Sequence, residues 1–216
     1  MVNVVVCDNS SETYDDLSNI IQKYTNIKYI NIRKYSGNIG YAYKVSINNI
    51  TTKYTLIVED DDLLCNNKLH NKIFNILKFS YDIISFSYKS IENNKIYTHM
   101  NFSENIQLNI TNAPLIWNGE FKFDCCYYPT EKLKIALNTW LKDDIHMFDG
   151  SSDEAICILM LNNTYITHIN ECGLFITTDK LNESLNNIYM VIYSSRSYIK
   201  ELALINNCSQ EWIDKY

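Results

Sequence analysis

The chain has 216 residues, enough for one sizeable domain. Hydrophobic residues make up 46% and charged residues 20%, which is typical of a globular protein and excludes a disordered chain. The net charge of −6, with no basic patch in the sequence, argues against nucleic-acid binding. No apolar stretch is long enough to cross a bilayer and no signal peptide opens the sequence, so we expect no transmembrane segment.

The first half of the chain alternates between apolar runs typical of strands and segments with helical spacing. This alternation is typical of βαβ units and predicts a parallel α/β sheet. The expected strands are 2–7, 27–32, 54–58 and 82–88, and the expected helices are 12–24, 41–49 and about 66–79.

The pattern changes after residue 89, where the apolar runs become shorter and less regular. Because no linker or internal repeat separates this part, we expect it to elaborate the same sheet and to end in a helical segment. The expected strands or short extended pieces are 96–100, 106–110, 121–128, 165–169 and 174–177, and the expected helices are 129–141, 153–161, 185–205 and a piece near 211.

The seven cysteines show neither the spacing of a metal site nor that of a disulfide framework. An odd number of cysteines without such a framework predicts reduced thiols and a cytoplasmic location.

Four adjacent carboxylates, from Glu59 to Asp62, follow directly after the apolar run 54–58. Strand ends in open α/β sheets are common ligand sites, and the four negative charges repel one another. A hard divalent cation binds one or two carboxylates together with substrate phosphates. Acids at the start of a helix over 63–78 are the alternative, but this accounts for one or two of them rather than four. The cluster therefore predicts a metal and phosphate site.

Four segments in this order resemble the family 2 glycosyltransferases of the GT-A fold: Val4 to Ser11, Asn38 to Ala42, Leu56 to Asp62, and Gly150 to Glu154. The resemblance covers roughly residues 2–170. It implies an α/β fold with a GT-A-like, mostly parallel sheet flanked by helices and a C-terminal helical extension. It also implies one domain over 1–216, with a nucleotide-binding half at about 1–90, an acceptor and catalytic half at about 91–180, and a helical segment at about 181–216.

The resemblance assigns the nucleotide-binding residues to the first half of the chain. In the family, the residue matching Asp8 contacts the nucleobase or ribose, and the segment with Asn38 and Gly40 lies near the nucleotide. Both possible alignments of the acidic run put a metal ligand at Asp61, and they place either Glu59 or Asp60 at the nucleoside.

The remaining roles are less specific. The resemblance implies that Asp62 supports the metal site from behind Asp61, and the alternative is that Asp62 caps the following helix. Asp153 matches the catalytic base of inverting members, with Glu154 as the alternative. Trp117 either stacks on an acceptor sugar or lies in the core under its loop. We expect His168, Asp124, Arg33 and Lys44 to be structural or solvated.

The resemblance therefore implies a glycosyltransferase that uses Mn²⁺ or Mg²⁺ and moves a sugar, with inversion, from a nucleoside-diphosphate sugar to a glycan or other hydroxyl acceptor. In the family, a further strand and helix that help to bind the nucleobase precede the segment matching Asp8, whereas here Met1 leads directly into Val2. The alternative is therefore a non-catalytic or degenerate GT-A-like module that binds a nucleotide or carbohydrate. A nucleotidyltransferase is disfavoured, because Asp8 to Ser11 is not a glycine-rich basic loop.

Overall fold

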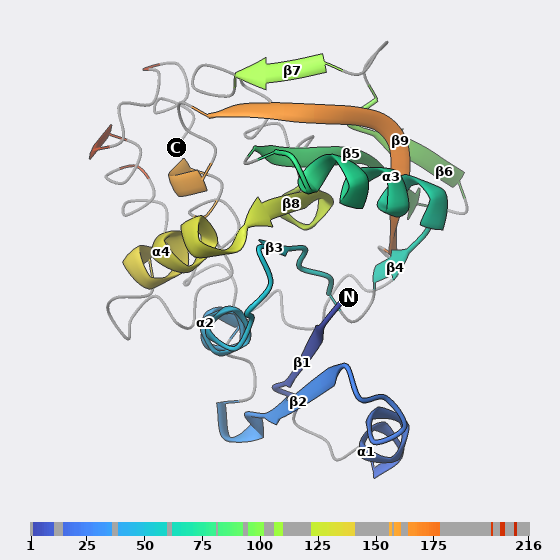
Figure 1. Cartoon of the computed structure of the whole chain (residues 1–216), viewed down its shortest axis with the longest axis vertical. Helices are drawn as coiled ribbons and strands as arrows, with labels where there is room; N and C mark the ends of the chain where they lie inside the picture. The colour runs from blue at the N-terminus through green and yellow to red at the C-terminus, as the bar shows by residue number, and fades with distance from the viewer. Residues whose placement is uncertain are drawn as a thin grey trace.

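The computed structural model describes residues 2–10, 15–35, 39–59, 62–80, 82–92, 95–101, 106–109, 122–140, 156, 158–160, 164–177, 200, 204–205 and 210. Within these residues the protein is a mixed α/β structure with a curled sheet flanked by helices, which confirms the predicted α/β class (Figure 1).

The amino-terminal region is a two-stranded parallel sheet of β1 (Val4–Asp8) and β2 (Ile27–Asn31). Helix α1 (Asp15–Ile21) lies between them in sequence, and the short 3₁₀ helix η1 (Arg33–Tyr35) follows β2. The register pairs Asp8 with Asn31, so both strands end at the same edge. Helix α2 (Ile39–Asn48) runs beside β1 (Figure 1).

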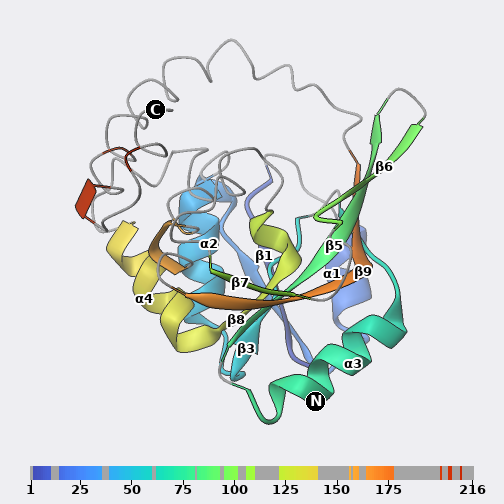
Figure 2. The ribbon, with the colours of Figure 1, turned by 90° about the horizontal axis from the view of Figure 1, so that it is seen from above.

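The larger sheet has the strand order β3-β8-β5-β9-β4, with β6 paired to β5 and β7 paired to β9. Figure 2 shows α3 on one side of the long strands β5 and β9, and α2 and α4 on the other. The bounds are β3 Tyr54–Thr55, β4 Asp62–Leu64, α3 Asn67–Leu77, β5 Ile83–Glu92, β6 Lys95–His99, β7 Ile106–Asn109, η3 (a 3₁₀ helix) Phe123–Cys125, β8 Cys126–Pro129, α4 Thr130–Trp140 and β9 Tyr165–Thr177.

Helix α3 shows how this sequence builds the core. Asn66 takes a left-handed backbone (φ 60°), and its side-chain oxygen accepts a hydrogen bond from the Leu69 backbone N–H at 3.2 Å, which caps the helix. Leu69 and Ile73, one helical turn apart, are fully buried against the sheet. Leu69 of α3 and Phe86 of β5 pack so closely against β9 that position 173 requires glycine, since a Cβ atom there would lie 2.6 Å from the Phe86 ring.

The predicted mostly parallel sheet is wrong for the described strands. The pairs β1–β2 and β5–β9 are parallel, and the other five pairs of the described strands are antiparallel. Antiparallel neighbours need only a short connection, as between β5 and β6, whereas parallel neighbours need a crossover of a dozen or more residues. The apolar runs do not distinguish these cases, because a strand buried on both faces has the same pattern either way.

Several predicted boundaries also differ. The strand expected over 54–58 pairs only at Tyr54–Thr55, which lie opposite Pro129 and Tyr128 of β8. The region expected to be helical from residue 63 begins instead as β4, which pairs with β9. The two strands expected over 165–177 form the single strand β9, and the strand expected from 121 is preceded by η3.

Some expected elements fall largely outside the described residues. Within the part of 185–205 that is described, Lys200, Leu204 and Ile205 are helical, in agreement with the predicted C-terminal helix. Among all described residues, no helix has the length and apolar character needed to cross a membrane.

Candidate active site

The structure describes four of the ten residues assigned to the site from the sequence. Asp8 ends β1, Gly40 is buried in the first turn of α2, Glu59 follows β3, and Asp62 opens β4. The other six lie outside the described residues: Asn38, Asp60, Asp61, Trp117, Asp153 and Glu154.

Three carboxylates from different parts of the chain converge. One oxygen each of Glu59, Asp62 and Asp124 lie within 4.8 Å of one another. Glu59 is exposed, Asp62 is half-buried, and Asp124 in η3 is only 3% exposed. Like charges at this distance repel, and burial of a carboxylate is costly, so these three residues are the described ones that could hold a cation.

The surrounding elements fix the cluster from several sides. The Asp62 N–H donates to the Glu59 carbonyl at 3.3 Å, and the Tyr43 hydroxyl of α2 donates to Glu59 Oε1 at 2.9 Å. Tyr43 also packs edge-on against Phe123, the neighbour of Asp124, with 6.0 Å between ring centroids. Helix α2, β4 and η3 therefore all position this acidic cluster.

Asp62 does not cap the following helix, because Asn66 does so. Asp124, for which the sequence predicts a structural role, lies beside Glu59 and Asp62. It lies more than 60 residues from Asp62 in the sequence, and no local pattern marks it. In the sequence, Asp124 is a single acid directly after Phe123 and before Cys125 and Cys126, and this is a weak indication of a site.

Asp8 is surrounded by hydrogen-bond donors from the protein itself. Its Oδ2 atom lies 2.7 Å from Arg33 Nη2 and 3.0 Å from Arg33 Nε, and it also accepts from the Tyr29 hydroxyl. Its Oδ1 atom accepts from the Ser10 N–H at 3.1 Å and from the Ser10 hydroxyl. Burial opposes ionisation, but the hydrogen bonds from Ser10, Tyr29 and Arg33 outweigh it and lower the pKa of Asp8 from 3.8 to about 2.

Arg33 is more accessible to a ligand than Asp8, for which the sequence predicts a contact with a nucleobase or ribose. The Asp8 side chain is 5% exposed, whereas that of Arg33 is 21% exposed. Asp8 thus orients Arg33 and Ser10 at the carboxyl end of β1, and Arg33 presents the more accessible surface of this network.

His168 is fully buried in β9, in agreement with the structural role expected from the sequence. Its Nδ1 atom lies 2.9 Å from the Ser85 hydroxyl of β5. Burial lowers the pKa of His168 from 6.5 to about 4, so the imidazole is neutral at pH 7.

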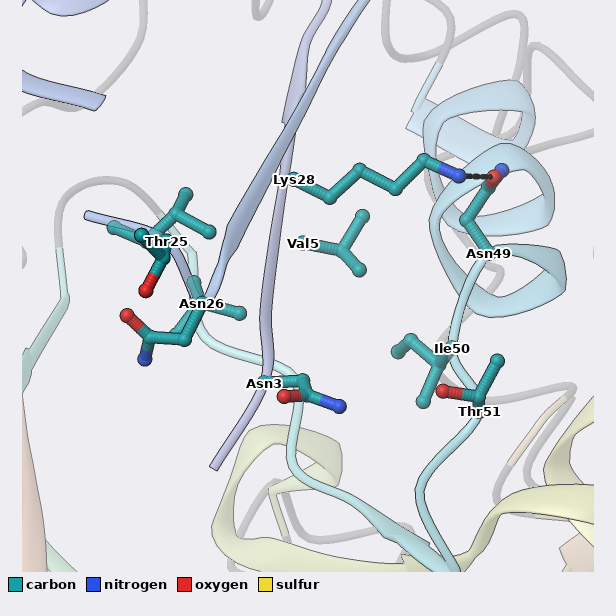
Figure 3. Close-up of a pocket in the computed structure, with 10 residues that line it drawn as sticks. Asn3, Val5, Thr25, Asn26, Lys28, Asn49, Ile50 and Thr51 are labelled. Atoms are coloured by element: carbon teal, nitrogen blue, oxygen red, sulfur yellow. Dashed lines mark hydrogen bonds between the residues drawn. The ribbon is translucent and has the colours of Figure 1, made fainter. Parts of the chain in front are cut away.

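A cavity of about 290 Å³ lies between the beginnings of β1 and β2 and the connection from α2 to β3. Figure 3 shows the Lys28 ammonium reaching across it to Asn49, with 2.7 Å between Nζ and Oδ1. None of the residues that line this cavity is acidic, and β1 separates it from Asp8 at the other end of the strand. We therefore place the candidate site at the acidic cluster and not in this cavity.

Solved structures of the S. aureus glycosyltransferase TarS share the fold of this chain. TarS 1–349 in complex with UDP matches with a TM-score of 0.68 and 18% sequence identity, over 99% of this chain and 59% of that chain. TarS 1–349 in complex with UDP-GlcNAc matches with a TM-score of 0.68 and 19% identity, over 99% of this chain and 60% of that chain. The fold is a glycosyltransferase-like fold.

The chain spans about three fifths of these two TarS chains and 36% of a longer TarS chain that it also matches. No protein-family model and no curated protein matches this sequence.

Proposed function

We propose that this protein is a glycosyltransferase that moves a sugar from a nucleoside-diphosphate sugar to a hydroxyl acceptor. The observation that carries the proposal is the convergence of Glu59, Asp62 and Asp124 in a fold shared with TarS, which has been crystallised with UDP and UDP-GlcNAc. Uridine nucleotides are therefore the first donors to test.

The acidic cluster fits a hard divalent cation, Mn²⁺ or Mg²⁺. It offers three carboxylate oxygens within 4.8 Å, and such ions take oxygen ligands from the protein and from substrate phosphates. We propose that Glu59, Asp62 and Asp124 hold the cation together with Asp61, which directly precedes Asp62 in the sequence. When bound, the cation would neutralise the charge of the leaving diphosphate.

The protein's own residues would orient the two substrates. Arg33, held by Asp8, would face the nucleoside end of the donor, near the segment with Asn38 and Gly40. Asp153 is the proposed base that removes the proton of the acceptor hydroxyl in an inverting reaction, with Glu154 as the alternative. Trp117 is the proposed stacking surface for an acceptor sugar.

A thermal-shift experiment tests the donor and cation site. We expect UDP together with Mn²⁺ or Mg²⁺ to raise the melting temperature more than UDP alone or the cation alone. At a hundredfold excess over Kd, a ligand stabilises the folded state by about 2.7 kcal/mol, which corresponds to a shift of several degrees for a chain of this size. If none of the uridine, guanosine, thymidine and cytidine diphosphates raises the melting temperature with either cation, the nucleotide site is wrong.

Turnover separates the enzyme from the non-catalytic binding module. A transferase should slowly hydrolyse a bound nucleotide sugar, since water replaces the acceptor. We expect cation-dependent release of UDP from UDP-GlcNAc or another uridine donor. Tight donor binding without any turnover would instead support a module that binds a nucleotide sugar without transferring it.

A further inference from the structure

We propose that Cys65 and Cys172 form a redox-active thiol pair, which a small disulfide such as oxidised glutathione converts into an intramolecular disulfide. The two Sγ atoms lie 3.6 Å apart. Both side chains are half-buried, so a small oxidant in solution has access to them. This modification site does not depend on the proposed sugar transfer.

The fold, and not the local sequence, brings the two thiols together, because they are 107 residues apart. Strands β4 and β9 are antiparallel, with Leu64 opposite Leu174. One residue further along, the Cys65 N–H donates to the Gly173 carbonyl at 3.0 Å. The direct hydrogen bond between the two backbones keeps Cys65 close to the neighbour of Cys172.

Only a small movement is needed to join the two sulfur atoms. A disulfide has an S–S length of about 2.05 Å, so the Sγ atoms must approach by about 1.5 Å, which side-chain rotation can supply. Cys172 lies where the register between β5 and β9 shifts at Ser87. Such a bulge redirects side chains, and here the Cys172 thiol faces Cys65.

The remaining thiols of the described residues are placed differently. Cys125 and Cys126 are fully buried beside β5, where a solvent oxidant does not reach them. Cys7 lies in β1, in the other sheet. Among the described cysteines, Cys65 and Cys172 therefore combine proximity with access to solvent.

The oxidation proceeds by two thiol–disulfide exchanges. The Cys65 thiolate attacks one sulfur of oxidised glutathione, and one glutathione thiolate leaves. The Cys172 thiol then loses its proton to solvent, and its sulfur displaces the second glutathione from Cys65. The two electrons and two protons of the cysteine pair end on two molecules of reduced glutathione. Burial raises the pKa of Cys172 to about 11, so we assign the first attack to Cys65.

The disulfide would tie β4, which carries Asp62, covalently to β9. A cross-link across 107 residues restricts the unfolded chain strongly. For a chain of this size, we expect the melting temperature to rise by roughly 5–15 °C on oxidation.

Peptide mapping of the full chain tests the pair directly. The reduced protein is incubated with oxidised glutathione, the remaining thiols are blocked with N-ethylmaleimide, and the protein is digested without reduction. We expect a linked peptide pair containing Cys65 and Cys172, lighter than the two separate peptides by two hydrogen atoms and absent after treatment with dithiothreitol. A glutathione that stays on either cysteine, or a link from either one to another cysteine, overturns the proposal.

Variants supply a second measurement. Cys65→Ser and Cys172→Ser should each abolish the rise in melting temperature, whereas the matched control Cys7→Ser should keep it. If a serine variant fails to fold, the reactivity of the two thiols in the wild-type protein tests the proposal. Phenylarsine oxide, which bridges two neighbouring thiols, should protect Cys65 and Cys172 together from N-ethylmaleimide. Labelling of both cysteines despite the arsenical would show that they are too far apart.

Discussion

Among the described residues, the single carboxylate Asp8 and a group of three carboxylates lie near strand ends, and they differ in how their charge is balanced. At the end of β1, Asp8 faces an arginine, a tyrosine hydroxyl and a serine. Between β3, β4 and η3, Glu59, Asp62 and Asp124 face one another. The first group contains its own counter-charge, whereas the second gathers like charges in one place.

A paired carboxylate and a cluster of carboxylates have different effects on stability and on ligand binding. Asp8 orients Arg33, and its pKa is low because the hydrogen bonds from Ser10, Tyr29 and Arg33 outweigh the effect of burial. Three converging carboxylates repel one another, and the cation of the proposed function would relieve that repulsion. The following experiments test this contrast, beginning with the largest expected effect.

Asp153→Asn should lower the catalytic rate without changing Asp8 or the cluster of three carboxylates. As the proposed base, it should lower the rate of transfer or hydrolysis by about 10²–10⁴-fold, because an amide cannot accept the acceptor proton. Cation-dependent UDP binding should stay close to that of the wild type. Glu154→Gln is the matched control and should lower the rate much less. Equal losses in both variants, or no loss in either, would contradict the assignment.

Asp62→Asn and Asp124→Asn should weaken cation-dependent UDP binding by at least about 10–100-fold, because each removes a proposed oxygen ligand of the cation. The same substitutions should leave the cation-free protein as stable as the wild type or more stable, since they relieve repulsion within the cluster. Titration calorimetry and melting curves with and without Mn²⁺ measure the two effects. Asp82→Asn, at an exposed position before β5, is the control.

If Asp124→Asn instead destabilises the cation-free protein and leaves UDP binding unchanged, Asp124 is structural, as expected from its sequence context. That result would leave Glu59 and Asp62 as the only described members of the cation site.

The sequence predicted the positions of most described elements better than the directions of the strands in the larger sheet. The runs at 2–7 and 27–32 pair in parallel as β1 and β2, as the alternation of strand and helix patterns predicted, although most residues of both strands are half-buried or exposed. Strand direction in the larger sheet was not predictable in the same way. Whether β8 runs along or against β5 depends on the path of the connection, and the pattern of Cys126 to Pro129 does not encode that path.

The acidic run was recognisable as a candidate site because four adjacent charges after an apolar strand are unusual. Asp124 was not, because it joins the cluster only through the pairing of β8 with β3 and β5. Arg33 was likewise expected to be solvated. Its ion pair with Asp8 could not be predicted, because it depends on the pairing of β1 with β2 and not on a local motif. Both omissions concern contacts between distant segments.

The pH dependence of stability should report on Asp8. Its folded-state pKa is lowered from 3.8 to about 2, so its contribution is fully present above pH 4 and is lost as the pH falls toward 2. The shift corresponds to about 2 kcal/mol of unfolding free energy. Asp8→Asn should therefore lower stability by about that amount at pH 7, and its difference from the wild type should shrink between pH 4 and pH 2. Urea unfolding at several pH values measures this, and a constant difference across the range would contradict it.

The smallest expected effects come from a matched pair of substitutions, one in each group. Tyr29 donates its hydroxyl hydrogen bond to Asp8, and Tyr43 donates its own to Glu59. Tyr29→Phe should cost about 1.5 kcal/mol of unfolding free energy, because it removes a hydrogen bond to a buried charge. Tyr43→Phe should cost less, since Glu59 is exposed and water can replace the hydroxyl.

In the presence of UDP and Mn²⁺ the order should reverse. Tyr43→Phe frees the Glu59 side chain to rotate away from Asp62 and Asp124, so it should weaken cation-dependent binding by a few-fold, whereas Tyr29→Phe should change that cation dependence little. Melting curves with and without the cation, recorded for both variants, provide the comparison. If both variants lose stability equally and neither changes the cation dependence, the two carboxylate groups do not differ in the way that their geometry implies.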